Sequence, residues 1–337
     1  MTERLRWGIL STADINNLMI PAIRKNPRCD LNAIASRDAG KAMKYASKHG
    51  ISIAYGSYEQ LLSDEEIDAV YISLPNSLHH EWCLKAARAG KHVLCEKPLA
   101  ITVESCREII LEAEKNNIFL QEGFMYRYHP RTCKIKEVVD QNFDQNMNYL
   151  YGVFSYFYED AYGKHPITNY RMTPEMGGGC LWDIGTYVVN FMRYLIGSEP
   201  IEVYGSMRNY PGFQVDGLFC GMMRFENSII TQFQCSYLHP QRTSTEIFGD
   251  NCSLTIPHSY CLVWDKSEPV VLTNKDGDTF LEESSANSYE MEVEHFSNCI
   301  LDKKERDVKL IDALNNIKVV VALHDAARNG CVVKINW

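Results

Sequence analysis

Strand-like and helix-like segments alternate over the first 123 residues, and this alternation restricts the possible fold more than any other feature of the sequence. Short apolar runs such as Leu5–Leu10, Leu31–Ala35 and Ile118–Glu122 are separated by stretches whose apolar residues recur at helical spacing. Such alternation is typical of a doubly wound parallel sheet with helices on both faces. The sequence therefore predicts an α/β domain over residues 1–125.

The pattern changes after residue 130, where segments rich in Tyr, Phe, Val and Ile have the period-two character of β-strands. These segments are Tyr149–Tyr158, Ile201–Ser206, Gly217–Phe225, Ser228–Tyr237, Ser244–Phe248, Ser253–Ile256 and Tyr260–Trp264. Helical segments at Asp183–Ile196, Tyr289–Leu301 and Ile311–Asn329 interrupt or close the series. We therefore predict a second domain over residues 126–337, built on a large, mostly antiparallel open sheet.

The formal net charge of −9 argues against a nucleic-acid partner, because phosphate binding needs clustered cationic surface and no Lys/Arg-rich run is present. The chain shows neither a secretory signal nor an apolar segment long enough for a membrane span. The twelve cysteines are scattered without a C-x-x-C pair, which favours reduced thiols over disulfides or a metal site. These features predict a cytoplasmic protein that handles small molecules and holds no metal.

The first strand-like run continues into a helix through Gly8-Ile9-Leu10-Ser11-Thr12-Ala13, which approximates the dinucleotide fingerprint G-x-G-x-x-G/A. Ser11 stands at the second glycine position, where its N–H and hydroxyl can still donate to a phosphate although its Cβ narrows the approach. A generic strand-to-helix turn explains these residues nearly as well. We expect Asp14 to cap the helix. The residues predicted to contact a dinucleotide here are Gly8, Ser11, Thr12, Ala13, Asp14 and Ile15.

The second strand-like run ends in Ser36-Arg37-Asp38, at the position where such folds bind the adenosine ribose. An acidic residue there accepts from the 2′-hydroxyl of NAD, whereas Ser and Arg suit the 2′-phosphate of NADP. Asp38 could instead cap the following helix, and a solvated charge pair at a strand end is a further alternative. We favour NADP(H) over NAD(H) as the cofactor.

The run His92-Val93-Leu94-Cys95-Glu96-Lys97-Pro98 places a lysine at the end of a predicted strand. Ligands bind at the carboxyl ends of the strands in open α/β sheets, so Lys97 is expected to face a ligand crevice. The alternative is that Lys97 only closes a loop.

Three consecutive glycines, Gly177–Gly179, precede a predicted helix on which Asp183 and Tyr187 are four residues apart. This spacing puts the carboxylate and the phenol on one helix face, beside a loop whose backbone can approach a ligand closely. The alternative is an N-cap aspartate and a core tyrosine.

Together with Lys97, Tyr187 could act as an acid and a base, because the ammonium group of the lysine lowers the pKa of a nearby phenol. A tyrosine that transfers protons near neutral pH needs a pKa lower than its ordinary value of about 10 by about 3. Lowering the pKa by this amount requires about 4 kcal/mol of free energy that favours the ionised phenol. One ammonium at about 4 Å in a site of effective dielectric about 20 supplies roughly this energy.

These motifs resemble the glucose–fructose oxidoreductase/inositol dehydrogenase/MocA family (Gfo/Idh/MocA). The resemblance spans nearly the whole chain and rests on the segments Gly8–Ala13, Leu74-Pro75-Asn76 with His79, Glu96-Lys97-Pro98, Gly177–Tyr187 and Lys318–Val333. It implies a Rossmann domain, a second domain whose open sheet forms dimers, and NAD(P)-dependent oxidation or reduction of a sugar, cyclitol or dihydrodiol. It also implies Lys97, Asp183 and Tyr187 as the catalytic set. The further cofactor residues that we expect are Leu74, Pro75, Asn76, His79, Glu96 and Lys97.

The sequence departs from the family pattern at Ser11, and Tyr187 stands where inositol dehydrogenases carry histidine. The chain therefore looks more like the branches with tyrosine, and we expect a carbohydrate-like substrate such as a pyranose, a ketosugar or a nucleotide-linked sugar. A trans-dihydrodiol or a cyclitol is the alternative substrate. The candidate substrate contacts are Lys97, Tyr126, Arg127, Arg171, Asp183 and Tyr187. We also expect a homodimer or homotetramer that assembles through the C-terminal sheet.

A sensor or co-regulator that binds dinucleotide and sugar without turnover is the rival hypothesis, because a fold does not determine a function. The presence of Lys97, Asp183 and Tyr187 together favours the enzyme, since a sensor does not need a proton relay.

Overall fold

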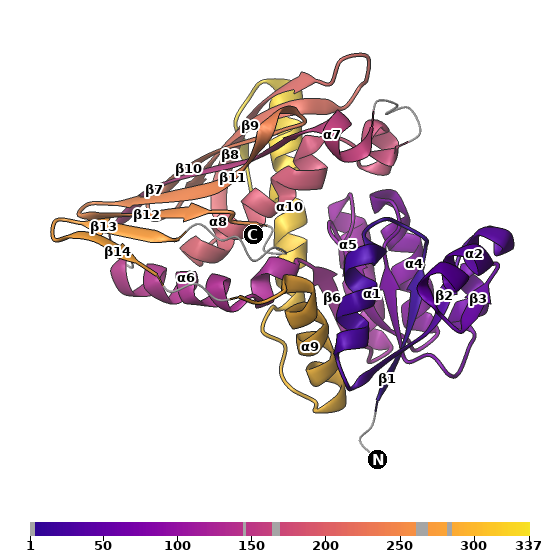
Figure 1. Ribbon diagram of the computed structural model, residues 1–337. Helices are drawn as coiled ribbons and strands as arrows, with labels where there is room; N and C mark the ends of the chain where they lie inside the picture. The colour runs from indigo at the N-terminus through magenta and orange to yellow at the C-terminus, as the bar shows by residue number, and fades with distance from the viewer. Residues whose placement is uncertain (1–3, 144–145, 164–168, 261–268, 282–284) are drawn as a thin grey trace. The chain divides into compact units, whose positions relative to one another are not determined.

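The computed structural model describes residues 4–143, 146–163, 169–260, 269–281 and 285–337 (Figure 1). The chain forms two compact units. The first contains Met1–Met125 and Tyr289–Leu314, and the second contains Tyr126–Ser288 and Asn315–Trp337. The sequence predicts one break, between residues 125 and 126, and gives no sign that residues 289–314 group with the N-terminal part.

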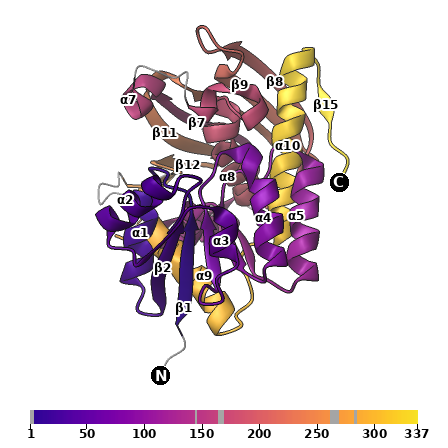
Figure 2. The same ribbon diagram turned by 90° about the vertical axis from the view of Figure 1, so that its right-hand side faces the viewer.

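The first unit is built on a six-stranded sheet with the strand order β3-β2-β1-β4-β5-β6. Every described pair of neighbouring strands in it is parallel. Helices lie on both faces of this sheet (Figures 1 and 2). Its elements are β1 Leu5–Leu10, α1 Asn16–Lys25, β2 Cys29–Ala35, α2 Ala39–His49, β3 Ile53–Tyr55, α3 Tyr58–Leu62, β4 Ala69–Ile72, α4 His79–Arg88, β5 His92–Glu96, α5 Val103–Lys115 and β6 Leu120–Gly123. The predicted doubly wound parallel sheet is confirmed.

Gly8 lies inside β1, as the predicted run Leu5–Leu10 requires, and a Cβ there would lie 2.7 Å from Leu61 Cδ2, so this glycine lets α3 pack closely on the strand. One local expectation at the first turn is wrong. Asp14 does not cap α1, because the N-cap position is occupied by Ile15 and no side chain caps the helix.

Helix α9, Ser288–Leu301, contributes to the core of the first unit. The fully buried ring of Phe296 lies with its centroid 4.8 Å from that of Trp7 in β1 and 5.3 Å from that of Phe119. Arg28 makes an ion pair with Asp302 at 2.7 Å beyond the end of α9. This aromatic packing accounts for the grouping of residues 289–314 with the N-terminal sheet.

The second unit contains a nine-stranded sheet with the order β14-β13-β12-β11-β7-β10-β9-β8-β15. The pair β7–β10 is parallel, and the other described pairs are antiparallel. The strands are β7 Met147–Phe157, β8 Pro200–Asn209, β9 Asp216–Phe225, β10 Ile230–Ser236, β11 Leu238–Gly249, β12 Cys252–Pro257, β13 Val271–Asn274, β14 Gly277–Phe280 and β15 Val333–Lys334. The helices are α6 Pro130–Asn142, α7 Tyr158–Tyr162, α8 Thr186–Ile196 and the part of α10, Leu310–Asn329, from residue 315 onward.

The mostly antiparallel sheet is confirmed, and six of the seven predicted strands match β7 to β12. Of the seventh, Tyr260–Trp264, residues 261–264 lie outside the described residues. The strands β13 and β14 are not predicted by the sequence pattern, because they are short and their connection, Asn274 to Gly277, is polar and charged.

One face of the nine-stranded sheet is covered by α8 and α10 (Figure 2). Close packing there depends on small residues: a Cβ at Gly205 of β8 would lie 2.7 Å from the Leu323 carbonyl oxygen of α10. On the opposite face, large apolar side chains are exposed from β8, β9, β10 and β11. They are Tyr204, Met222, Ile230 and Phe248.

Candidate active site

The turn after β1 is formed around Ser11, whose backbone has a φ of +127°. This conformation is normal for glycine and costs other residues about 1–3 kcal/mol. Ser11 therefore adopts the backbone geometry of the glycine that it replaces. Its side chain is buried and accepts a hydrogen bond from the N–H of Ala13 at 3.2 Å, two residues farther along the turn.

A buried network of hydroxyl and amide groups holds this conformation. The Ser73 hydroxyl donates to Asn16 Oδ1 at 2.7 Å, and the Asn16 amide donates to the Ser11 carbonyl oxygen at 3.0 Å. The one proton of the Ser73 hydroxyl is thus engaged, so the Ser11 hydroxyl is the donor toward Ser73, and its single proton is shared between Ser73 Oγ at 2.8 Å and Ser73 O at 3.0 Å. These bonds fix the turn between the end of β1, the loop after β4 and the first residue of α1.

We expect the substitution Ser73→Ala to lower the free energy of unfolding by about 1–3 kcal/mol, because it leaves Asn16 Oδ1 buried without this donor. Denaturant unfolding of the variant would measure the loss. The matched control is Ser63→Ala, whose exposed hydroxyl donates only to the Glu59 carbonyl oxygen, with an expected change within about 0.5 kcal/mol. Equal stability of the two variants would show that the network does not hold the turn.

At the end of β2 the three predicted ribose-side residues have different surroundings. Asp38 caps α2, because its carboxylate accepts from the Lys41 N–H at 2.9 Å. Ser36 is buried, and its hydroxyl accepts from the Asp38 N–H at 3.3 Å. Arg37 is exposed, and its charge lies close enough to the Tyr58 hydroxyl at the start of α3 to interact with it. The alternative that Asp38 is a helix cap is thus confirmed.

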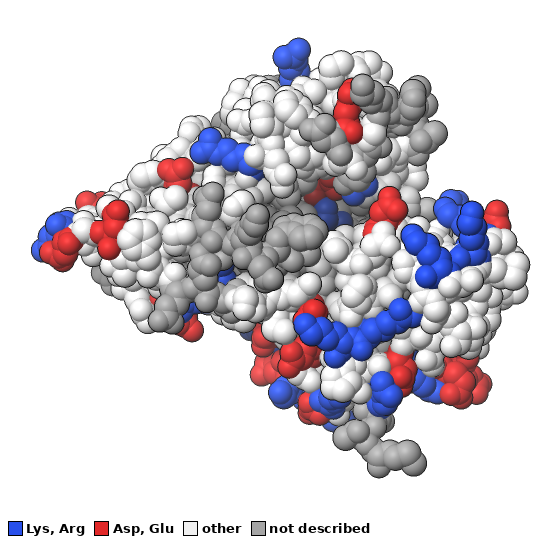
Figure 3. All heavy atoms as spheres, viewed as in Figure 1, with Lys and Arg blue, Asp and Glu red and all other residues white. Residues whose placement is uncertain are grey.

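Exposed lysines on α2 extend the positive charge of Arg37. They are Lys41 and Lys44. Lysine and arginine side chains gather over α1 and α2 on the face shown in Figure 3. Such a group of cations attracts a phosphate dianion more strongly than a neutral ribose.

Lys97 follows the last residue of β5 and precedes a cis peptide bond to Pro98. Two side chains hold the backbone directly after it: Glu122 of β6 accepts from the Leu99 N–H at 2.8 Å, and His79 of α4 contacts the Pro98 carbonyl oxygen at 2.8 Å. The Lys97 segment is thus fixed between β6 and α4 at the carboxyl edge of the sheet.

The predicted contacts of the β4 loop lie at the same edge of the sheet. Asn76, directly after Pro75, begins a short 3₁₀ turn and is buried, as is Leu74. The His79 ring has no exposed surface, so it presents nothing to a cofactor in this structure.

Glu96, which is half-buried, lies near a second and fully buried glutamate that the sequence pattern does not indicate. Tyr71 of β4 donates to Glu96 Oε1 at 2.5 Å, and Glu292 of α9 lies close enough for its charge to interact with Glu96. Burial, and next the Glu96 carboxylate, raise the pKa of Glu292 well above its ordinary value. Glu292 is one of three alternating glutamates on α9, and nothing in the sequence sets it apart.

In the second unit, the glycine loop leads into a π-helical turn, Leu181–Gly185, which continues directly as α8. Sequence spacing does not predict this π-helical turn, a feature that is frequent at functional sites. Asp216 of β9 holds its start, because its carboxylate accepts from the Leu181 N–H at 2.7 Å. Gly179 is required there, since a Cβ would lie 2.0 Å from Asp216 Oδ1. Burial raises the pKa of Asp216.

Asp183 lies on this π-helical turn and is 5% exposed. Its Oδ2 accepts from the Tyr156 hydroxyl at 2.8 Å and from the Tyr237 hydroxyl at 3.0 Å. Arg171 Nε lies 3.0 Å from the same oxygen, as an ion pair without the alignment of a hydrogen bond. The structure thus brings together two predicted substrate contacts, Asp183 and Arg171, with two tyrosines that the sequence analysis misses.

Tyr187 lies on the first turn of α8 and is 6% exposed. Its ring centroid lies 5.9 Å from that of Phe154 and 6.2 Å from that of Tyr126. This aromatic surrounding fixes the ring, so that the phenol oxygen has a defined direction.

Two more of the predicted substrate contacts, Tyr126 and Arg127, have partners within the second unit. The fully buried Tyr126 donates to Asn190 Oδ1 at 2.5 Å, and Arg127 donates to the same oxygen at 3.1 Å. The Arg127 guanidinium also lies 4.0 Å from the centroid of the Tyr194 ring. Both side chains thus brace α8, and Tyr126 presents no surface to a substrate in this structure.

Comparison with known proteins identifies the family. The family model described as "Oxidoreductase family, NAD-binding Rossmann fold" matches residues 5–124, and the model described as "GFO/IDH/MocA C-terminal domain" matches residues 134–255. An uncharacterized oxidoreductase, ORF334, of Rhizobium meliloti is 32% identical over 99% of both chains. The chain belongs to the Gfo/Idh/MocA family.

Two further relatives of this family have more informative names. D-xylose 1-dehydrogenase (NADP(+)) 2 of Haloferax volcanii is 30% identical over 98% of this chain and 100% of its own length. The crystal structure of aldose-aldose oxidoreductase from Caulobacter crescentus, in complex with glycerol, superposes with a TM-score of 0.88 at 25% identity, covering 99% of this chain and 100% of the other. As a Gfo/Idh/MocA protein, the chain is an oxidoreductase with an NAD(P)-binding Rossmann domain.

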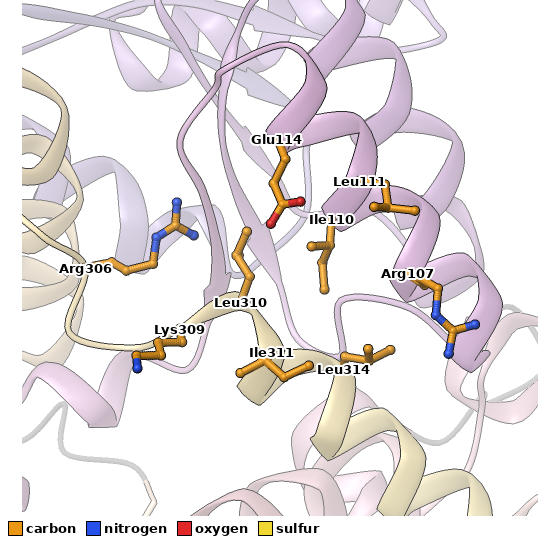
Figure 4. Close-up of a pocket in the computed structure, with 9 residues that line it drawn as sticks. All are labelled: Arg107, Ile110, Leu111, Glu114, Arg306, Lys309, Leu310, Ile311 and Leu314. Carbon is orange, nitrogen blue, oxygen red and sulfur yellow. The ribbon is translucent and has the colours of Figure 1, made fainter. Parts of the chain in front are cut away.

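Among the described residues of this Gfo/Idh/MocA protein, no helix is long and apolar enough to cross a membrane, and no three His, Cys, Asp or Glu side chains are grouped to hold a metal ion. A cavity of about 480 Å³ lies beside α5 and the start of α10 (Figure 4). It is lined by Arg107, Ile110, Leu111, Glu114, Arg306, Lys309, Leu310, Ile311 and Leu314. It contains none of the predicted site residues.

Proposed function

We propose that this protein is an NADP(H)-dependent oxidoreductase that acts on a carbinol or ketone carbon of a sugar-like substrate, such as a pyranose, a ketosugar or a nucleotide-linked sugar. The observation that carries the proposal is the set of donors around the carboxylate of Asp183. Asp183 is buried, as is Tyr187 four residues farther along the chain. The names of the two relatives, a xylose dehydrogenase and an aldose-aldose oxidoreductase, support the substrate class.

The first unit fits a dinucleotide. Its strand order is that of the dinucleotide-binding Rossmann sheet, in which the ligand lies at the carboxyl ends of the strands. The turn with positive φ at Ser11 leads directly into α1, whose first N–H groups have no capping side chain. The positive end of the helix dipole at such an N-terminus is suited to a pyrophosphate. When bound, the nicotinamide would supply or accept the hydride.

The residues of this chain would transfer the proton of the substrate hydroxyl and stabilise the negative charge that develops on its oxygen. We assign Tyr187 as the group that takes the hydroxyl proton in the direction of oxidation and returns it in reduction. Lys97 would stabilise the developing alkoxide with its ammonium group. Asp183, held by two tyrosine hydroxyls and Arg171, would orient a substrate hydroxyl at the floor of the site.

The cofactor choice is tested by titrating the protein with NADPH and NADH in parallel, using energy transfer from tryptophan to the nicotinamide. We expect tighter binding of NADPH, and Arg37→Ala should weaken NADPH binding about 10–100-fold with little effect on NADH, because the lost bond joins two charged groups. Lys48→Ala, in the last turn of α2, is the control and should change neither affinity by more than about twofold. Preference for NADH in the wild type would overturn the assignment, and binding of neither would overturn the proposed function.

We also propose that the exposed face of the nine-stranded sheet pairs with a second copy of the chain. Its apolar residues form neighbouring rows, since Tyr204 pairs with Met222 and Ile230 pairs with Tyr149, the cross-strand partner of Phe248. Sedimentation velocity should show a dimer or tetramer for the wild type and a smaller species for Met222→Lys. Met43→Lys, an exposed methionine of α2, is the control and should leave the assembly unchanged. A monomeric wild type would contradict the proposal.

A further inference from the structure

The imidazole ring of His79 connects the two loops that follow β4 and β5. Its Nε2 lies 2.8 Å from the Leu74 carbonyl oxygen, in the loop after β4, and its Nδ1 lies 2.8 Å from the Pro98 carbonyl oxygen, one residue after Lys97. The ring is completely buried. His79 is the first residue of α4, so that this helix holds both loops through one side chain.

The chemistry of these two contacts is unusual because both partners are carbonyl oxygens, which can only accept hydrogen bonds. A neutral imidazole carries one N–H and can donate to one of them. Two simultaneous hydrogen bonds require the imidazolium, in which both nitrogens carry a proton. The two contacts can therefore both be hydrogen bonds only when the ring is doubly protonated.

The surroundings of His79 set the conditions under which it takes up the second proton. Burial lowers the pKa of His79, the two carbonyl oxygens raise it, and the ammonium of Lys97, the charged group that acts on the ring, lowers it. Because the net direction is downward, the second proton binds at a pH below the ordinary histidine pKa of about 6.5. At neutral pH the ring donates to one carbonyl, and on acidification it donates to both.

We propose that His79 is a positioning residue that fixes the Lys97 segment to the β4 loop through a connection that gains a second hydrogen bond on protonation. The inference rests on the proposed function, in which Lys97 acts on the substrate. It gives His79 a different task from the cofactor contact that the family resemblance implies. Here the ring sets where the Lys97 backbone lies and has no surface for a ligand.

The decisive variant is His79→Phe, with His80→Gln as the matched control. His80 is the next residue on α4 and its Nε2 contacts Glu108, outside the proposed site. In single-turnover measurements of hydride transfer, His79→Phe should be about 10–100-fold slower than the wild type, because small displacements of a catalytic group are costly. Its NADPH affinity should stay within about threefold. The control should change neither quantity. Wild-type hydride-transfer rates in His79→Phe would overturn the inference.

A spectroscopic test on the wild type does not depend on whether a variant folds. In ¹⁵N NMR of protein with labelled histidine, the His79 ring should change from one to two protonated nitrogens with a midpoint below about 6.5. Substitution His79→Gln, which keeps one donor, assigns the signal by its disappearance. A ring with one proton throughout the range from pH 5 to 8 would refute the second hydrogen bond. If Lys97→Ala leaves hydride transfer intact, the proposed function fails; if only His79→Phe does so, this inference alone fails.

Discussion

Lys97→Ala is expected to slow hydride transfer by about 10³-fold while leaving NADPH affinity within a few-fold of the wild type. The loss corresponds to about 4 kcal/mol of transition-state stabilisation, the energy of a charged donor directed at a developing oxyanion in a site shielded from water. Binding of the cofactor should persist, because the turn at Ser11 and the cations at the end of β2 lie on other loops. Single-turnover absorbance of the nicotinamide measures the rate, and energy transfer from tryptophan measures the affinity.

Two further variants test whether the loss of rate is specific to the side chain of Lys97. Lys97→Arg keeps the positive charge but changes its shape and reach, so that partial activity is expected. Lys85→Ala removes a partly exposed lysine of α4 that pairs with Glu59 and Glu81, and it should leave the rate unchanged. If the wild type binds NADPH but turns over no sugar, ketosugar or dihydrodiol, and Lys97→Ala binds equally well, the sensor hypothesis would replace the enzyme.

The sequence was sufficient to predict the fold class because periodicity and strand ends are local signals. The alternation between Leu5 and Gly123 and the period-two runs of the second domain correspond to observed strands and helices. Two features of the fold depend on contacts between residues that are far apart in the sequence. Phe296 joins Trp7 across 289 residues of chain, and no local pattern in α9 indicates that partner. The parallel pairing of β7 with β10 cannot be predicted from the sequence either, because apolar and polar residues alternate along each strand in the same way whichever strand is its neighbour.

The candidate site was predicted only as far as residue type and spacing allow. Asp183 was found through its place after the glycine loop, but its donors Tyr156 and Tyr237 come from β7 and from the residue directly after β10. Neither tyrosine stands in a motif, and both look like ordinary strand residues. Ser11 shows the opposite case. The sequence shows a departure from glycine, whereas the structure shows that the backbone keeps the glycine conformation and that Ser73 and Asn16 stabilise it.

Tyr187→Phe is expected to reduce turnover by about 10²–10⁴-fold with little change in cofactor affinity. The substitution removes one oxygen atom and keeps the ring that packs against Phe154 and Tyr126, so that the shape of the second unit is retained. A positioned general acid–base accounts for a rate factor of this size. Steady-state kinetics in both directions would measure the loss, which should fall mainly on kcat because the phenol proton moves in the transition state.

The control for this variant is Tyr55→Phe, which removes a hydroxyl of β3 that donates to Asp64 and should leave turnover unchanged. A second comparison separates proton transfer from mere packing. Tyr187→His replaces the phenol with another group able to move a proton near neutral pH, whereas Tyr187→Leu removes both the ring and the proton. Activity in the order wild type, histidine, phenylalanine and leucine would support the proton role. If phenylalanine retains most of the turnover, the proton passes through Lys97 or a water molecule, and Tyr187 serves the site only by packing.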